Sequence, residues 1–133
     1  MRFMNRASVE VASTWAQTIG YSRATRAGDL IFVSGTTATG PDGKALHPGD
    51  AGAQATTILE RIVAAIKELG AGPQHVIETR IYLTDISSWQ AVGRAHGAMF
   101  REVRPATTIV QVGPLISPEL LVEISAIASL AAG

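Results

Sequence analysis

The chain has 133 residues, the size of one ordinary domain. Its 11 basic and 11 acidic residues cancel, so the excess positive charge that attracts nucleic acid is missing, which argues against a nucleic-acid partner. The chain contains no cysteine, which excludes disulfides, thiolate metal sites and a cysteine nucleophile.

The N-terminal segment lacks an apolar stretch followed by a small-residue cleavage site, and no window has the length of a membrane span. We therefore expect a cytoplasmic protein without a membrane partner. Residues 1–17 are predicted to be a loose lead-in. Residues 18–133 are predicted to be a single domain, because no linker or repeat divides them.

The first half of the chain predicts a β-hairpin followed by a helix. Residues 18–27 carry scattered β-formers, residues 30–33 are a continuous apolar run, and Gly28-Asp29 between them is a turn signal. After a polar loop over 36–49, a helix is expected to begin behind Asp50 as N-cap and to end at Gly70. Its apolar face comprises Ile58, Leu59, Ile62, Val63, Ile66 and Leu69.

The second half predicts a strand, a helix and a C-terminal hairpin. Residues 76–83 alternate, with Ile77, Thr79, Ile81 and Leu83 on one side. The second helix has an apolar face comprising Trp89, Val92, His96, Met99, Phe100 and Val103, and it cannot pass Pro105. Trp89 is expected in the core. Residues 104–128 contain two strand patterns around a Gly-Pro turn, which we interpret as a hairpin.

These elements favour an α+β fold, a mixed sheet of four or five strands with two helices on one face. In the last strand neither side has the polar character of a solvated face, although the helices can cover only one of them. We therefore expect another subunit to pack against the second face.

Glu123 is a carboxylate inside this apolar strand, and burying it is unfavourable unless something binds it. Three interpretations stay open: a surface residue on an edge strand, a structural partner of Arg80 or another base, or a catalytic acid/base at a subunit cleft. His96 is expected to be a hydrogen-bonded core histidine. His47 and His75 have no partner at metal-ligand spacing, so no metal site is predicted.

Four segments together resemble the Rid family, also called the YjgF family, whose members are often labelled endoribonuclease L-PSP or reactive intermediate deaminase. They are LIFVSG at 30–35, KELGAG at 67–72, TRIYLTDI at 79–86 and RPATTIVQV…LLVEISAIA at 104–128. The resemblance covers residues 18–129. It implies a chorismate-mutase-like fold and a homotrimer whose sheets surround a central barrel, with clefts between subunits. It also implies cofactor-free hydrolysis of small 2-enamines and 2-imines such as 2-aminoacrylate.

The resemblance assigns site residues by position. Tyr21 matches the cleft tyrosine, and Ser34 and Gly35 match a small pair beneath the substrate. Glu123 matches the glutamate that positions the hydrolytic water. Ile109 matches a position whose backbone groups face the ligand.

One position departs from the deaminating branch, which has an arginine two residues after the proline to clamp the substrate carboxylate. Here Thr107 stands there, and threonine cannot replace a guanidinium. Arg80 or Arg104 would have to supply a cation from another direction. We therefore predict a poor 2-aminoacrylate deaminase whose pocket, lined by Thr107, takes a small imine, enamine or carbonyl compound. The alternatives are a non-catalytic ligand-binding or regulatory trimer, and an endoribonuclease.

Overall fold

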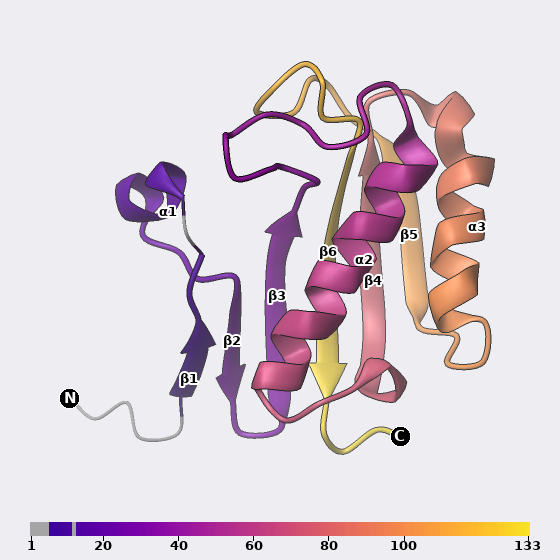
Figure 1. The fold of residues 1–133 in the computed structure, drawn as a ribbon. Helices are drawn as coiled ribbons and strands as arrows, with labels where there is room; N and C mark the ends of the chain where they lie inside the picture. The colour runs from indigo at the N-terminus through magenta and orange to yellow at the C-terminus, as the bar shows by residue number, and fades with distance from the viewer. Residues whose placement is uncertain (1–5, 12) are drawn as a thin grey trace.

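The computed structural model, which describes residues 6–11 and 13–133, contains one six-stranded mixed sheet with its two long helices packed on one face (Figure 1). The strands lie in the order β1-β2-β3-β6-β4-β5. The predicted α+β class is confirmed, with more strands than expected. In chain order the elements are β1 (Arg6–Val9), α1 (Thr14–Ile19), β2 (Ala24–Ala27), β3 (Leu30–Thr36), α2 (Ala51–Glu68), β4 (Val76–Leu83), α3 (Trp89–Phe100), β5 (Ala106–Gln111) and β6 (Val122–Ser129), with 3-10 turns at Pro73–His75 and Ile86–Ser88.

The predicted loose lead-in contains two ordered elements, β1 and α1, in its described part; residues 1–5 and 12 lie outside the described residues. β1 pairs antiparallel with β2. The Ser13 hydroxyl caps α1 by accepting from the backbone N–H of Trp15, and Gly20 ends the helix at φ 81°. The strand predicted over 18–27 is therefore confined to β2, because α1 and the turn at Gly20 occupy its first residues.

The hairpin predicted at Gly28-Asp29 is confirmed, since β2 and β3 pair antiparallel with Ala27 opposite Leu30. Gly28 adopts φ 60°, a conformation that favours glycine. β3 continues through Ser34 and Gly35, and its register against β6 shifts between Val33 and Thr36. This irregularity lies where β3 approaches the side chains of β6.

The C-terminal hairpin prediction is wrong, because β5 and β6 do not pair with each other. β5 runs parallel to β4, whereas β6 runs antiparallel to both β3 and β4 and lies between them. The link through α3 is a crossover connection, which returns the chain parallel to the strand it left. The connection over 112–121 then carries the chain past β4 (Figure 1).

The first long helix forms as its sequence predicts. The Asp50 carboxylate accepts from the backbone N–H of Ala53 at 3.0 Å, and Gly70 follows the helix at φ 96°. Its buried face covers β3 and β6 and forms the centre of the core with the apolar side of the sheet. Fully buried members of this core include Ile31, Ile58, Ile62, Ile66, Ile81, Leu83, Val92, Val122 and Ile124.

Two apolar residues placed in the core by their spacing lie on the surface of the chain. Trp89 is 51% exposed, because it begins α3 before the turn that buries Val92. Ile77 is 40% exposed, because a register shift between Val76 and Glu78 takes it out of the alternation of β4. The remaining predicted inward residues of β4 are buried.

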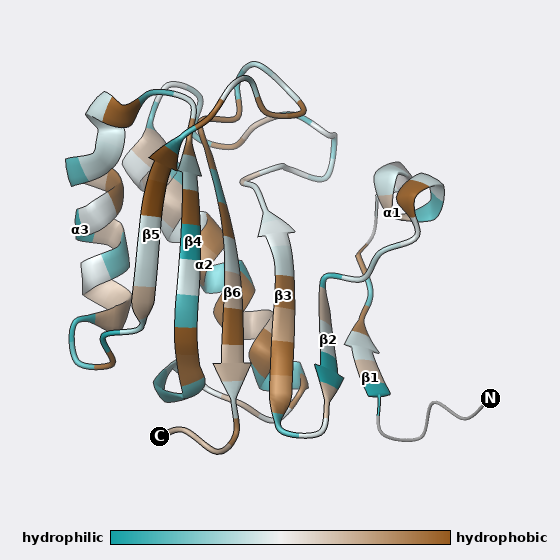
Figure 2. Cartoon of the chain, turned by 180° about the vertical axis from the view of Figure 1, so that it is seen from behind, coloured by the Kyte–Doolittle hydropathy of each residue, from teal (hydrophilic) through white to brown (hydrophobic). Residues whose placement is uncertain are grey.

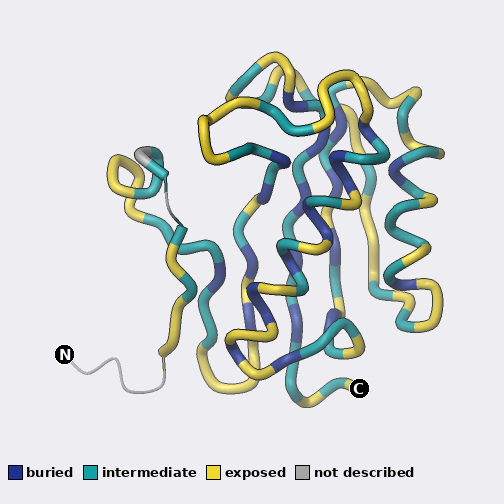
Figure 3. Tube along the Cα trace, viewed as in Figure 1, coloured by how far each residue is buried: buried dark blue, intermediate teal, exposed yellow. Residues whose placement is uncertain are grey.

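The two long helices cover one face of the sheet and leave the other face without a helix (Figures 2 and 3). Along β6 every second residue is buried against the helices, whereas Glu123, Ser125 and Ile127 on the helix-free face are half-buried. Phe32 of β3, opposite Ile127, is 50% exposed on that face. No helix in the described part of the chain is long and apolar enough to cross a membrane.

Gln54 links the helical layer to the loop that leads into β6. It is fully buried on the apolar face of α2. Its Nε2 donates to the carbonyls of His47 at 3.2 Å and Glu119 at 3.0 Å, and its Oε1 accepts from the N–H of Leu121 at 2.9 Å. One side chain therefore satisfies three backbone groups from two loops.

Replacing Gln54 with Leu should destabilise the protein by about 3 kcal/mol, because it leaves those buried backbone groups without a partner. Chemical denaturation followed by circular dichroism measures this. Thr56→Ala, on the exposed side of the same helix, is the matched control and should change the free energy of unfolding by about 0.5 kcal/mol or less. Equal effects of the two substitutions would contradict the bridging role.

Candidate functional site

Glu123 lies on the helix-free face, where its side chain covers the backbone of Gly35. In the sheet it is opposite Tyr82 of β4. A Cβ built on Gly35 would lie 2.5 Å from Oε2 of Glu123, closer than real contacts allow. The missing side chain of Gly35 thus lets the Glu123 carboxylate lie against the backbone of β3. The predicted contact of Gly35 with a substrate stays a prediction.

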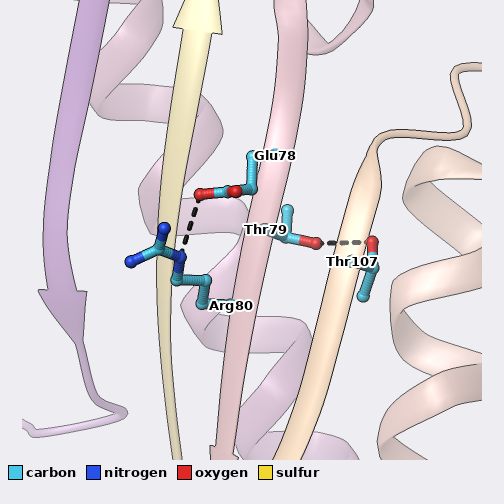
Figure 4. A network of polar contacts seen from close by, with 4 residues as sticks. All are labelled: Glu78, Thr79, Arg80 and Thr107. Atoms are coloured by element: carbon cyan, nitrogen blue, oxygen red, sulfur yellow. Dashed lines mark hydrogen bonds and ion pairs between the residues drawn. The ribbon is translucent and has the colours of Figure 1, made fainter.

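The position of Glu123 excludes one of the three interpretations and narrows a second. β6 is a central strand, so Glu123 is not an edge-strand surface residue. Arg80 forms its ion pair with Glu78, at 2.9 Å between Nε and Oε1, so it is not the partner of Glu123 (Figure 4). The acid/base interpretation and a link to another base remain.

Burial raises the pKa of the Glu123 carboxyl, and the nearby charge of Arg23 acts in the opposite direction. The two side chains, both in the described part of the chain, do not close into an ion pair. A half-buried carboxylate without a paired cation holds a proton more readily than an exposed one. Such a group is suited to exchange a proton with a bound molecule.

Arg23 is the residue of this site that the sequence analysis missed. Its Nη1 donates to the carbonyl of Gly35 at 3.0 Å and to Oγ1 of Thr36 at 2.9 Å. Its guanidinium lies 5.8 Å from the ring centroid of Tyr21. The signal available in the sequence is the spacing of two between Tyr21 and Arg23, which places extended-chain side chains on one side.

Tyr21 and Ser34 belong to the same region. The Ser34 hydroxyl donates to the carbonyl of Ser22 at 2.7 Å, which ties β3 to the segment carrying Tyr21. Both residues line an open cavity of about 320 Å³ on the helix-free side, together with Arg6 and Phe32. The structure thus brings Tyr21, Ser34, Gly35 and Glu123 to one part of the sheet, as the resemblance implies.

A larger cavity of about 540 Å³ lies at the opposite end of the sheet and holds none of the predicted site residues. Its charged lining consists of Glu102 and Arg104. Glu123 lines neither cavity, but the smaller one adjoins its contact with Gly35, because the lining includes Ser34, the neighbour of Gly35 in β3.

Thr107 and Ile109 do not meet Glu123 within one chain, because β4 lies between β5 and β6. The Thr107 hydroxyl contacts the Thr79 hydroxyl at 2.8 Å (Figure 4) and donates to the carbonyl of Pro105 at 3.1 Å. Ile109 is half-buried and packs against the core. Their predicted ligand contacts therefore require a neighbouring chain.

His96 completes that hydroxyl network from α3. Its Nε2 lies 2.9 Å from the Thr79 hydroxyl, and its ring lies 4.9 Å from that of Phe100. Burial lowers the pKa of His96, so the ring is neutral at physiological pH. The expected hydrogen bond is present, but the ring is half-buried at the margin of the core rather than inside it. Among residues 6–11 and 13–133 no three side chains of metal-binding type cluster together.

Comparisons with known proteins agree on one family. The family described as Endoribonuclease L-PSP matches residues 11–130, a span that includes α1. The uncharacterized protein SCO2049 of Streptomyces coelicolor is 39% identical over 116 residues, 87% of this chain and 86% of that protein. The 3-aminoacrylate deaminase RutC of Acinetobacter baylyi is 34% identical over 108 residues, 81% of this chain and 85% of that protein.

A solved structure has the same fold at high similarity. It is Rv2704 of Mycobacterium tuberculosis, described as a member of the YjgF/YER057c/UK114 family, with 43% sequence identity and a TM-score of 0.85. The match covers 94% of this chain and 99% of that one. The six-stranded mixed sheet with its helices is therefore an arrangement that this family shares.

Glu123→Gln should stabilise the fold at neutral pH, because the amide removes a half-buried charge. The raised pKa means that the folded state binds the Glu123 proton more tightly than the unfolded state does. Its stabilising contribution is thus present at low pH and lost as the pH rises through the folded pKa. We expect the variant to melt a few degrees above wild type at pH 7 and the difference to shrink toward pH 4.

Thermal melts across this pH range provide the measurement. Glu60→Gln, which changes an exposed carboxylate on α2, is the control and should leave the melting temperature nearly unchanged. A pH-independent difference in melting temperature between wild type and Glu123→Gln would show that burial does not raise the pKa of Glu123.

Proposed function

The chain belongs to the endoribonuclease L-PSP family, also known as the Rid or YjgF family, and from this membership we propose that it hydrolyses a small imine or enamine without a cofactor. The observation that carries the proposal is the Glu123 carboxylate, held over Gly35 with a raised pKa. The relative named a 3-aminoacrylate deaminase supports enamine chemistry on this fold.

The reaction needs a water and two proton relays. Water adds its oxygen to the C=N carbon and gives one proton to Glu123, which passes it to the nitrogen, so that a neutral carbinolamine forms. Glu123 then takes the hydroxyl proton of the carbinolamine and delivers it to the amine, the C–N bond breaks, and ammonia leaves while a carbonyl product remains. A carboxyl group whose pKa is raised by burial can accept a proton and donate it again.

Thr107 supports assignment to a branch that lacks the substrate-binding arginine. Its short side chain is uncharged, and its hydroxyl is engaged with Thr79 and the Pro105 carbonyl. The candidate substitutes also point elsewhere, since Arg80 pairs with Glu78 and Arg104 donates Nε to the Arg101 carbonyl. On this basis the protein is a poor 2-aminoacrylate deaminase.

A homotrimer would bring the two parts of the predicted site together. Tyr21, Ser34 and Glu123 lie on one part of the sheet, whereas Thr107 and Ile109 lie on the edge strand β5. A neighbouring copy can supply its β5 to this face. The exposed ring of Phe32 on the helix-free face supports burial against another copy.

In light scattering at micromolar concentration, we expect a mass about three times the 13.9 kDa of the chain. A monomeric mass at that concentration would contradict the shared cleft.

The catalytic proposal predicts that wild type accelerates hydrolysis of at least one imine in a panel generated by an amino-acid oxidase, measured as ammonia release, and acts only slowly on 2-iminopropionate, the imine form of 2-aminoacrylate. Glu123→Gln should lower the rate by about 100-fold or more, because it removes the proton-transferring group. Gly35→Ala should act similarly, since its new methyl displaces the carboxylate. Gly113→Ala, where a Cβ meets nothing within 4 Å, is the matched control and should retain activity.

Other outcomes favour other functions. Saturable binding without turnover across an imine and enamine panel would favour a non-catalytic regulatory trimer, which the absence of an arginine at position 107 also supports. RNA cleavage that Glu123→Gln abolishes would favour the ribonuclease, against which the balanced charge of the chain argues.

A further inference from the structure

Arg23 is a half-buried cation that closes no ion pair within the described part of the chain, although its charge acts on the nearby Glu123 carboxyl. Only its Nη1 has protein acceptors there, the Gly35 carbonyl and the Thr36 hydroxyl. Nε and Nη2 have none among residues 6–11 and 13–133. A guanidinium withdrawn from water is stabilised by an anion, and its remaining donors form a fork suited to a carboxylate.

The surroundings of Arg23 are positive. Arg61 of α2 donates Nη1 to the Thr37 carbonyl at 2.9 Å, so a second guanidinium lies at the end of β3, where Arg23 bonds Gly35 and Thr36. Burial and the charge of Arg23 both lower the pKa of Arg61. Arg6 lines the adjoining cavity. The half-buried carboxylate near these cations is Glu123, which makes no ion pair with them.

The position of Arg23 is fixed relative to the reacting groups. Its Nη1 bonds the carbonyl of Gly35, the residue whose Cα lies under the Glu123 carboxylate. Its guanidinium also lies near the ring of Tyr21. A small molecule on Glu123 can therefore place an anionic group against the free edge of Arg23.

We propose that Arg23 binds the carboxylate of the substrate, so that the site takes a small imine or enamine acid whose anion points toward β2. This inference rests on the proposed function and names its substrate class. It is compatible with poor turnover of 2-aminoacrylate. An acid whose carboxylate binds Arg23, beside β2, presents its imine carbon to Glu123 from a different direction than an acid bound by an arginine at position 107 of β5.

The test compares binding of pyruvate, a product-like acid, with that of its neutral analogue pyruvamide by NMR titration. Wild type should prefer pyruvate, and Arg23→Gln should weaken pyruvate binding by about 10- to 100-fold with little change for pyruvamide. Arg23→Lys should recover part of the preference. Arg80→Gln removes a cation from the same face and is the matched control, expected to behave as wild type.

A measurement on the wild-type trimer covers the case in which Arg23→Gln does not fold. The Arg23 Nε–H resonance, assigned with Arg23→Lys, should shift on addition of pyruvate and not of pyruvamide. The inference is overturned if wild type does not prefer the acid, if Arg23→Gln retains the preference, or if the resonance does not respond. Pyruvate binding through Arg23 without imine hydrolysis would refute the proposed function and leave the inference standing.

Discussion

The close approach of Glu123 to Gly35 is the contact on which the candidate site depends. It requires a residue without a side chain on β3, because any Cβ would collide with the carboxylate. It also lies beside the register shift between Val33 and Thr36, where β3 departs from regular pairing. Glycine and the irregular pairing thus make room for a charge in the middle of a sheet, where a charge is otherwise unfavourable.

The stability that offsets this charge comes from the other side of the same strand. Val122 and Ile124, on either side of Glu123, are fully buried under α2. Gln54 of that helix accepts a hydrogen bond from the backbone of Leu121, two residues before Glu123. The helix therefore helps to fix the start of β6 and with it the position of Glu123. Period-two alternation therefore lets one strand pack the core on one face and place a half-buried carboxylate on the other.

Local signals made much of this fold predictable. The Asp50 cap, the Gly28 turn and the alternation of β6 each depend on residues close in sequence, and each is confirmed. The predicted hairpin over 104–128 failed because strand pairing is not local: nothing within β5 indicates that its neighbour is β4. Arg23 was missed for a related reason, since only the pairing of β2 with β3 brings it to Gly35.

Thr107 belongs to a polar network rather than to the neighbourhood of Glu123. It joins Thr79 and a neutral His96 on the helical side of β5. With threonine present, the unpaired cation near Glu123 is Arg23, which comes from the same chain and is held by the backbone of β3. If Arg23 binds the substrate acid, the polar contacts of the site come largely from one chain, and the β5 of a neighbouring copy in the proposed trimer would mainly shape the cleft.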